Sequence, residues 1–236
     1  MEVINLQLTN YKEKDGLVLL FNHEGVYTYH VKGVQNPKSE NIVLASALNI
    51  VDVEAMAGNY KYPIVKNTKV VFSPYTSKDS LLKMGVLALL QECTRQLLQD
   101  EEKPLIYDLL KKSLYEIKNE TKSLLEIAIH YLLRVLKISG YEFEVNHCVF
   151  CGKKTDIVAF SFIEGGFICR DCMMEDIVKD LTPLQMRWIR YLSMDTDKQI
   201  DITLSDEDAL TILNKLDEFV KDGLGITLHS IALINS

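Results

Sequence analysis

The first 75 residues carry short apolar and alternating runs that are typical of β-strands. Val3–Leu8 partly alternates between apolar and polar side chains, and Gly16–Phe21 and Val26–Val31 are rich in apolar, β-branched and aromatic residues. Two further runs lie near residues 48–55 and 64–72. Because no helical pattern separates these five runs, they predict a small closed barrel rather than an open parallel sheet.

From residue 77 to residue 140 the period changes to that of helices. Residues 81–98 and 124–138 are apolar on nearly every side, which is typical of helices in the middle of a bundle. The stretch between them, Leu105–Lys118, is amphipathic. Ser139-Gly140 predicts the end of the second apolar helix, because glycine readily takes the left-handed conformation of a C-cap.

Two more helices are predicted in the last third of the chain. Thr182-Pro183-Leu184-Gln185 has the form of a capping box with proline at the first helical position. Ser205 begins a helix that we expect to run to about Asp222, with Gly223 as its stop.

Four of the five cysteines form two closely spaced pairs. The first pair is Cys148 and Cys151, the second is Cys169 and Cys172, and 17 residues separate them. This spacing predicts one tetrahedral zinc site, because each CxxC turn aims two sulfurs at a common point. A strand at Ile157–Phe162 between the pairs completes the outline of a zinc ribbon. Four thiolates leave no open coordination position, so the single predicted ion is structural rather than catalytic.

Two alternatives for this cluster stay open. The pairs could form disulfides, although paired cysteines in a reducing cytosol are more often metal ligands. His147 precedes the first pair and could replace Cys148 as a ligand. Cys93 stands apart in an apolar helical run and is interpreted as a small core residue.

Together these patterns predict an α+β protein. At 236 residues, with 47% hydrophobic and 25% charged, the chain has an ordinary globular composition and room for several small domains. The predicted parts are a small β-barrel (1–76), a first portion of a helical bundle (77–145), a zinc ribbon inserted in that bundle (146–176), and a second portion of the bundle with the C-terminal segment (177–236).

The formal net charge is −7, which argues against a polycation that coats nucleic acid or anionic membrane. The excess of acidic over basic residues is unevenly distributed along the chain. Residues 1–80 contain eight lysines, no arginine and eight acidic residues, so this segment is neutral overall. The composition therefore leaves room for a local basic groove on the barrel.

The chain carries none of the common enzyme signatures that we looked for. There is no GxxxxGK phosphate loop followed by Ser or Thr, and no GxGxxG, HExxH or GxSxG motif. There is also no secretory signal and no run of about 18 apolar residues. We therefore expect a cytoplasmic protein, without membrane contact, that is not an enzyme; a metal-dependent hydrolase is the least favoured alternative.

Three stretches, taken in order, resemble one known family. They are Tyr11-Lys-Glu-Lys-Asp15-Gly-Leu-Val-Leu-Leu-Phe21 continuing to Glu24-Gly25 and Lys32-Gly33, then Ile138-Ser-Gly140-Tyr141 leading to Cys148-Val-Phe-Cys151-Gly152, then Gly165-Gly166-Phe-Ile-Cys169-Arg-Asp-Cys172. The individual barrel residues have low specificity, and the ordered combination is much more specific than any one stretch. This combination resembles the bacterial recombination-mediator family RecO over nearly the whole chain.

The resemblance implies an OB-fold for the barrel and binding to single- and double-stranded DNA. It also implies that the protein anneals strands and works with RecR and sometimes with RecF. It further implies contact with single-stranded-DNA-binding protein, which helps RecA to load on coated strands. It implies no bond-making chemistry. In an OB-fold groove, cations meet phosphates and aromatic rings stack on bases. The candidates for these roles are Lys32, Lys38, Lys61, Lys66, Lys69, Tyr27, Tyr29, Tyr60 and Tyr62. Each lysine could instead be an ordinary surface residue, and each tyrosine a core or cross-strand residue.

The chain departs from this family just after the third predicted strand, where members usually carry a cluster of Arg and Lys. Here the sequence reads Lys32-Gly33-Val34-Gln35-Asn36-Pro37-Lys38. The departure favours few phosphate contacts and motivates an alternative, a protein-interaction scaffold of the same fold with little DNA binding of its own. An acidic peptide tail would need an apolar pocket with a cation, for which the candidates are Arg95, Lys111, Lys112 and Arg134.

Overall fold

The computed structural model describes residues 1–56, 61–97, 103–194 and 204–236, so the candidate Tyr60 lies outside the described residues. Backbone contacts divide the chain into two compact units. We call residues 1–80 with 98–121 the barrel unit and residues 81–97 with 122–236 the helical unit. Within the described ranges, every helix is too short or too polar to cross a membrane.

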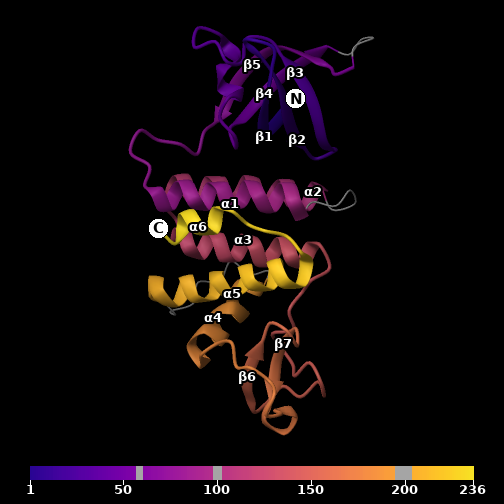
Figure 1. The fold of residues 1–236 in the computed structure, drawn as a ribbon, viewed down its shortest axis with the longest axis vertical. Coiled ribbons are helices and arrows are strands. Elements are labelled where there is room, and N and C mark those ends of the chain that lie inside the picture. Colours follow the sequence, from indigo (N-terminus) through magenta and orange to yellow (C-terminus); the bar gives the residue numbers. More distant parts are fainter. Residues whose placement is uncertain (57–60, 98–102, 195–203) are drawn as a thin grey trace. The chain divides into compact units, whose positions relative to one another are not determined.

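Five strands form the predicted barrel (Figure 1). Their spatial order is β1-β2-β3-β5-β4, and pairing of β1 with β4 closes the ring. The β3–β5 pair is parallel and the other four pairs are antiparallel. This closed five-stranded barrel confirms the OB-like fold class expected from the sequence. The strands are β1 (Glu2–Tyr11), β2 (Asp15–Asn22), β3 (Gly25–Val31), β4 (Ile50–Met56) and β5 (Ile64–Phe72).

Small branched side chains fill the barrel, because alternate residues of each strand point inward. The short helix η1 (Glu40–Leu44) lies between β3 and β4 and adds Leu44 to this core. The hydroxyl of Ser39 caps η1 by accepting the backbone N–H of Asn41 at 3.2 Å. The buried core residues are Val3, Val18, Leu20, Val31, Val34, Leu44, Val51, Val53 and Val65.

The amphipathic helix α2 (Lys103–Asn119) belongs to the barrel unit. Its Tyr107 packs edge-on against Phe21 of β2, with 5.4 Å between ring centroids. The Tyr107 hydroxyl donates to Glu2 at 3.0 Å, and Lys111 lies 2.6 Å from the same carboxylate. The sequence-based division placed this segment with the helical bundle. An amphipathic pattern shows that a helix buries one face, but it does not say which partner covers that face.

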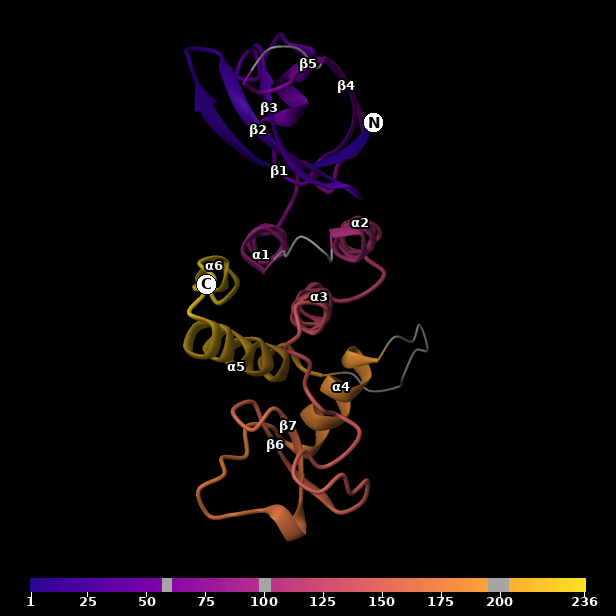
Figure 2. The ribbon, with the colours of Figure 1, turned by 90° about the vertical axis from the view of Figure 1, so that its right-hand side faces the viewer.

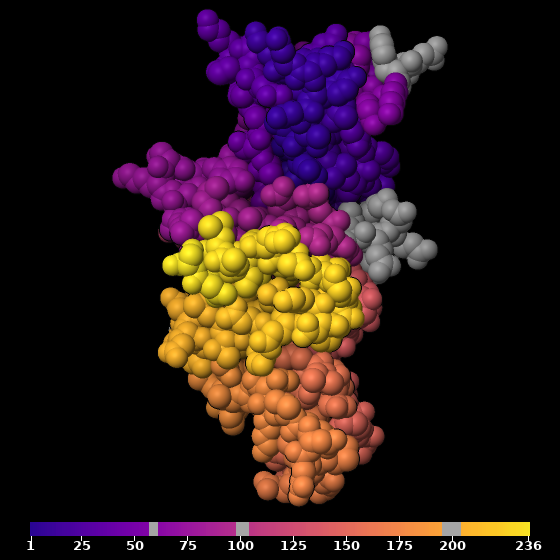
Figure 3. Space-filling model, viewed as in Figure 1, coloured from indigo at the N-terminus to yellow at the C-terminus, as the bar shows by residue number. Residues whose placement is uncertain are grey.

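Helix α3 (Leu124–Ile138) lies between α1 (Leu81–Leu97) and α5 (Asp206–Leu224) in the helical unit (Figures 1 and 2). Helix α4 (Pro183–Ser193) also contacts α3, and the short helix α6 (Ser230–Ile234) packs against α1. With neighbours on several sides, α3 buries nine of its residues. The all-round apolar pattern therefore predicted its central position correctly. The C-terminal residues, drawn in yellow, cover one face of this unit (Figure 3).

The predicted helix ends are mostly observed. Gly140 follows α3 with φ +85°, and the N–H of Tyr141 donates to the Leu136 carbonyl at 2.8 Å. The capping box before α4 is complete, since the Thr182 hydroxyl accepts the Gln185 N–H at 3.3 Å and the Gln185 side chain accepts the Thr182 N–H at 2.9 Å.

The end of α5 differs from the prediction. The helix continues through Gly223 to Leu224, and Gly225 is the cap, with φ +69°. The N–H of Gly225 donates to Lys221 at 3.0 Å, and the next N–H, that of Ile226, reaches Val220 at 3.3 Å. The bond from Gly225, which is in the left-handed conformation, is the one that defines the αL capping motif, and the cap lies two residues later than expected.

Gly85 and Gly223 both lie inside helices of the helical unit, but their surroundings differ. A Cβ atom on Gly85 would come within 2.8 Å of Ile234 Cγ1 on α6 and 3.2 Å of the Ile234 backbone nitrogen. A Cβ atom on Gly223 would make an ordinary contact, 3.6 Å from the Phe219 ring. The first glycine permits a close approach of two helices, whereas the second has space for a side chain.

We expect Gly85→Ala to lower the free energy of unfolding by about 1–3 kcal/mol, because the added methyl group overpacks the contact between α1 and α6. The matched variant Gly223→Ala should raise it by about 0.5–1 kcal/mol, because alanine is the better helix former. Urea unfolding followed by circular dichroism measures both changes. Effects of the same sign and size would contradict the close contact at Gly85.

Candidate metal centre and nucleic-acid interface

The four paired cysteines come together in space. The ribbon that carries them consists of β6 (Ile157–Ser161), the antiparallel strand β7 (Gly166–Cys169) and the short helix η3 (Arg170–Cys172). Gly152 takes a left-handed conformation, with φ +74°, and donates its N–H to the Cys148 carbonyl at 2.8 Å, which closes the first CxxC turn. The four sulfurs that lie within 4.8 Å of one another belong to Cys148, Cys151, Cys169 and Cys172.

The electrostatics of this cluster suit a cation. Burial raises the pKa of the Cys148 thiol, but hydrogen bonds from backbone N–H groups, first that of Cys169, outweigh burial and lower the pKa to about 6. The neighbouring sulfur of Cys151, followed by burial, raises the pKa of Cys172 to about 12. Crowded thiols thus oppose one another's ionisation, and a bound cation removes that opposition. Four thiol ligands fit a soft divalent ion, so the cluster can hold a metal.

The neighbouring His147 is not part of the sulfur cluster. Its ring nitrogen Nδ1 lies 3.3 Å from the Glu144 carboxylate, which also accepts the backbone N–H groups of Asn146 at 2.6 Å and His147 at 3.1 Å. The turn before the first cysteine therefore holds this histidine on a carboxylate. Cys93 is fully buried in α1, where burial raises the pKa of its thiol, as expected for a core residue.

A lysine joins the two ends of the ribbon. Lys153 follows the first cysteine pair and lies 3.0 Å from Asp171, which stands between the cysteines of the second pair. The same ammonium group lies 3.0 Å from Asp156. Hydrogen bonds to these two carboxylates raise the pKa of Lys153, so the lysine stays charged and helps to hold the turns together.

A groove on the barrel gathers cations and aromatic rings. It has a volume of about 310 Å³. The ammonium of Lys12 lies 5.3 Å from the centre of the Tyr11 ring, and that of Lys61 lies 5.4 Å from the centre of the Tyr62 ring. Such spacing is within the range of cation–π contacts. The residues that line the groove are Tyr11, Lys12, His30, Lys32, Lys61, Tyr62 and Ile64.

Asp15 organises the wall of this groove. Its carboxylate accepts the backbone N–H of Gly33 at 2.9 Å and lies 2.9 Å from Nε2 of His30. The bond from Gly33, and then the neighbouring His30, hold the pKa of Asp15 below its usual value. The aspartate is therefore ionised at neutral pH, and it positions the backbone next to Lys32.

Three of the predicted DNA-contact residues, Lys32, Lys61 and Tyr62, share this groove. Tyr11, Lys12 and His30 also line it, although sequence reasoning did not select them. A signal was available, because Tyr11 and Lys12 begin the turn between β1 and β2. His30 comes from β3, and its ring lies edge-on to that of Tyr11, with 5.3 Å between ring centroids. The parallel β3–β5 pair places His30 opposite Ile64 and so adds the segment of Lys61 and Tyr62, a pairing that the local sequence pattern does not reveal.

The other predicted lysines lie away from the groove lining. Lys69 faces Asp52 across the β4–β5 register, so an acid stands beside this cation. Lys66 is exposed on β5, and Lys38 is exposed in the turn after β3.

The predicted tyrosines of β3 also lie outside the groove lining. Tyr27 is exposed, and its hydroxyl donates to the Glu24 carbonyl at 3.2 Å. Tyr29 packs against the barrel core, which favours the structural interpretation of that residue over base stacking.

A second hollow with basic character lies in the helical unit, between the ribbon and α4. Its volume is about 630 Å³, and Phe167 and Met186 give it an apolar wall. Arg190 donates to the side chain of Asn146 at 3.4 Å. The lining contains three cations and no carboxylate; its members are Asn146, Lys154, Ile157, Val158, Phe167, Pro183, Met186, Arg187 and Arg190. We call this the basic hollow. Its lining includes none of Arg95, Lys111, Lys112 and Arg134, the four cations considered from the sequence.

Known proteins resemble the chain over most of its length. Residues 79–231 match the family described as "Recombination protein O C terminal". A DNA repair protein RecO of Syntrophomonas wolfei is 26% identical over 164 residues, a match that covers 69% of this chain and 65% of that protein.

Longer matches have similar identity. The DNA repair protein RecO of Clostridium perfringens is 28% identical over 207 residues, which is 86% of this chain and 83% of the relative. That of a Thermoanaerobacter species is 25% identical over 240 aligned positions, which is 100% of this chain and 96% of the relative. The family match therefore extends across the helices and the cysteine pairs, and the relatives add the barrel.

Proposed function

The chain belongs to the RecO family of DNA repair proteins, and from this we propose that it acts as a recombination mediator. In this role it binds DNA, promotes annealing of complementary strands, and helps RecA to load. It makes and breaks no covalent bonds, and it works in the cytoplasm. The observation that carries the proposal is the family match over residues 79–231 together with a five-stranded barrel at the N-terminus.

The barrel groove is the proposed site for DNA. Lys12, Lys32 and Lys61 give the groove three cations that can meet phosphates, and the rings of Tyr11 and Tyr62 can stack on bases. Stacking on an aromatic ring tolerates any base sequence, which suits a protein that anneals many different strands. The other predicted contacts, Lys38, Lys66, Lys69, Tyr27 and Tyr29, lie outside this groove and would serve only a wider DNA path.

The small number of cations favours weak DNA binding. The barrel segment has no arginine and is electrically neutral, and the turn after β3 lacks a basic cluster. With about three phosphate contacts, affinity for single strands falls with a log–log salt slope near −2. These observations also support a second candidate function, a scaffold of the same fold that binds repair proteins and has little DNA affinity of its own.

We propose that the four cysteines hold one zinc ion. Zinc prefers a tetrahedral set of thiolate ligands, and four protein ligands leave no position for a substrate. When bound, the ion would supply a structural crosslink between the two turns of the ribbon. The chain's own contribution is visible in the backbone N–H groups that stabilise the Cys148 thiolate and in Lys153, which joins the turns.

The proposed partners are RecR, in some systems RecF, and single-stranded-DNA-binding protein. The basic hollow is the proposed docking site for an acidic peptide tail of the last of these. Its three cations, Lys154, Arg187 and Arg190, face an apolar wall, and its lining has no carboxylate to repel such a tail. Charge-assisted bonds from arginine to a carboxylate are among the stronger polar contacts in proteins.

We expect about one zinc ion per chain after extensive dialysis, as measured by mass spectrometry of the metal content. Cys169→Ser should lose most of this zinc and increase amide hydrogen exchange in residues 146–176, because the proposed ion crosslinks the two cysteine turns of the ribbon. Cys93→Ala is the matched control and should keep the full content, since Cys93 is buried in α1. A zinc content near zero in fresh, reduced protein would contradict the proposal.

For DNA, we expect fluorescence anisotropy to detect single-strand binding at low salt with a log–log slope near −2. Lys61→Gln and Lys12→Gln should each weaken binding and reduce the slope by about 0.7, because each removes one phosphate contact. The control Lys69→Gln should change little, since Lys69 faces Asp52 away from the groove.

Binding and annealing that are absent even with RecR present would reject the mediator role. Retained binding of RecR or of the acidic tail in that case would favour the scaffold.

For the acidic tail, we expect Arg187→Ala to weaken binding of a labelled acidic peptide about tenfold, the effect of losing one charge-assisted hydrogen bond. Arg95→Ala is the control, because this exposed arginine of α1 lies outside the basic hollow. Titration by fluorescence anisotropy measures both affinities. A larger loss of peptide affinity in Arg95→Ala than in Arg187→Ala would show that the tail docks outside the basic hollow.

A further inference from the structure

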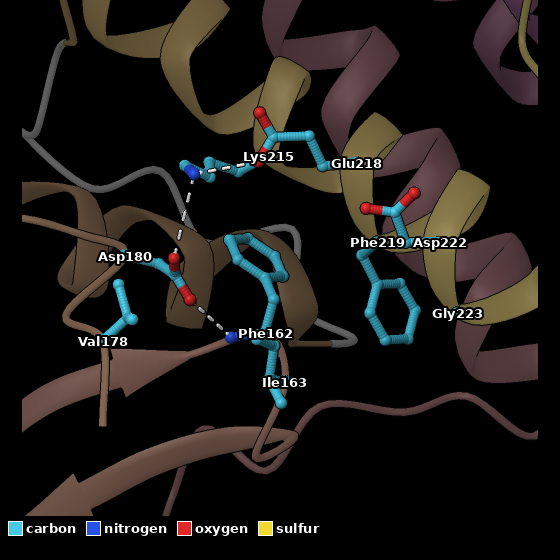
Figure 4. A pocket seen from close by; sticks show the side chains of 9 residues that line it. All are labelled: Phe162, Ile163, Val178, Asp180, Lys215, Glu218, Phe219, Asp222 and Gly223. Carbon is cyan, nitrogen blue, oxygen red and sulfur yellow. Dashed lines mark hydrogen bonds and ion pairs between the residues drawn. The ribbon is translucent and has the colours of Figure 1, made fainter. Parts of the chain in front are cut away.

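A third hollow lies between the ribbon and the C-terminal half of α5, within the helical unit (Figure 4). Its volume is about 450 Å³, which falls in the range of about 300–1,000 Å³ that is usual for binding sites. Phe162 comes from the end of β6 and Phe219 from α5, and their rings line the interior. The Phe219 ring packs against Phe143, with centroids 4.9 Å apart, so this wall is held in place. We call this the acidic hollow.

The rim of the acidic hollow exposes apolar side chains. Ile163 is 83% exposed, and Val178 is 56% exposed. Both residues line the same hollow as the two phenylalanines. Apolar side chains that are grouped around a concave surface, rather than scattered singly, are typical of an interaction site.

The charged groups of this hollow leave an excess of negative charge. It is lined by three carboxylates, those of Asp180, Glu218 and Asp222, and by one cation, Lys215. Lys215 lies 2.9 Å from Glu218 and 4.0 Å from Asp180, so its charge is already shared between two acids. The other oxygen of Asp180 accepts the Phe162 N–H at 2.8 Å, which anchors the ribbon end (Figure 4).

Asp222 stands apart from these contacts. Among the described residues it has no ion-pair partner. It lies in the last turn of α5, where the unpaired carbonyl groups add negative partial charge. The one basic residue of that turn is Lys221, and its charge lies near Asp217, where it opposes the rise that burial causes in the pKa of that carboxyl. Asp217 is not part of the lining. The rim near Asp222 therefore attracts a cation.

We propose that the acidic hollow docks a segment of a partner protein in which one bulky apolar side chain stands next to a lysine or arginine. The apolar side chain enters between Phe162 and Phe219 and covers Ile163. The adjacent cation meets Asp222 and the exposed carboxylate of Glu218. Charge complementarity selects this occupant, because DNA phosphates and an acidic tail would both be repelled by the same carboxylates.

This site is separate from the proposed function. The barrel groove and the basic hollow share no lining residue with the acidic hollow. The ribbon places Phe162 in the acidic hollow and Phe167 in the basic one, so the two hollows offer separate sites for peptides of opposite charge.

The test begins with a phage-displayed library of random short peptides selected on the full-length protein. We expect the enriched peptides to pair Leu, Phe or Trp with a neighbouring Lys or Arg. An enriched peptide should bind at least tenfold more weakly to Ile163→Gln and to Asp222→Lys, as measured by fluorescence anisotropy. Both variants should fold, because Ile163 is almost fully exposed and a lysine is favourable in the last turn of a helix.

Glu175→Lys is the matched control, since it reverses one exposed acid of the helical unit outside the hollow, and it should leave peptide affinity within twofold. DNA affinity and acidic-tail affinity should stay unchanged in all three variants, which separates this site from the proposed function. The proposal is overturned if no peptide is enriched, if the enriched peptides are acidic, or if both hollow variants bind them normally. Self-association of the protein that Ile163→Gln abolishes would also overturn it, because the occupant would then be a second copy.

Discussion

The convergence of four cysteine sulfurs is the constraint on which the ribbon and its two flanking hollows depend. The apolar cluster packed beside these cysteines has three buried members, Ala159, Ile168 and Ile177. A separate set of ring contacts joins Phe143, Phe160, Phe162 and Phe167. Sulfurs within 4.8 Å of one another join the turn before β6 to the turn after β7, at the end of the hairpin where Ile157 pairs with Cys169. The first of these turns holds Phe167, whose carbonyl accepts the Val149 N–H at 2.8 Å, while Asp180 holds the Phe162 N–H at 2.8 Å. Each of the two phenylalanines lines a different hollow.

The net charge of −7 describes no single surface of this protein. The barrel groove contains three lysines, the basic hollow contains three cations, and the acidic hollow contains three carboxylates with one lysine. Salt screens exposed charges beyond about 10 Å at ordinary ionic strength. Each surface therefore presents its own local charge to a partner, and the average over the chain decides little about what binds where.

Local patterns predicted the elements well where one physical rule dominated. Short apolar, β-branched and partly alternating runs over the first 75 residues predicted the strands, because such side chains suit the pleated surface of a barrel. The four cysteines were predicted as one cluster because each CxxC turn aims two sulfurs at a common point. The end of α5 was predicted two residues early, since Gly223 and Gly225 are both acceptable stops and only the bonds to Lys221 and Val220 select the later one.

The sequence by itself determined the family, the strand and helix periods, and the sulfur cluster, because each of these is encoded in residues that are close along the chain or in a fixed order. Only the tertiary structure decided that α2 packs on the barrel through Tyr107, and that Tyr11, His30 and Lys61 share a groove. It alone also separated a basic hollow from an acidic one. The reason is that a surface is assembled from segments far apart in sequence, and a local pattern shows which face is buried but not which segment will cover it.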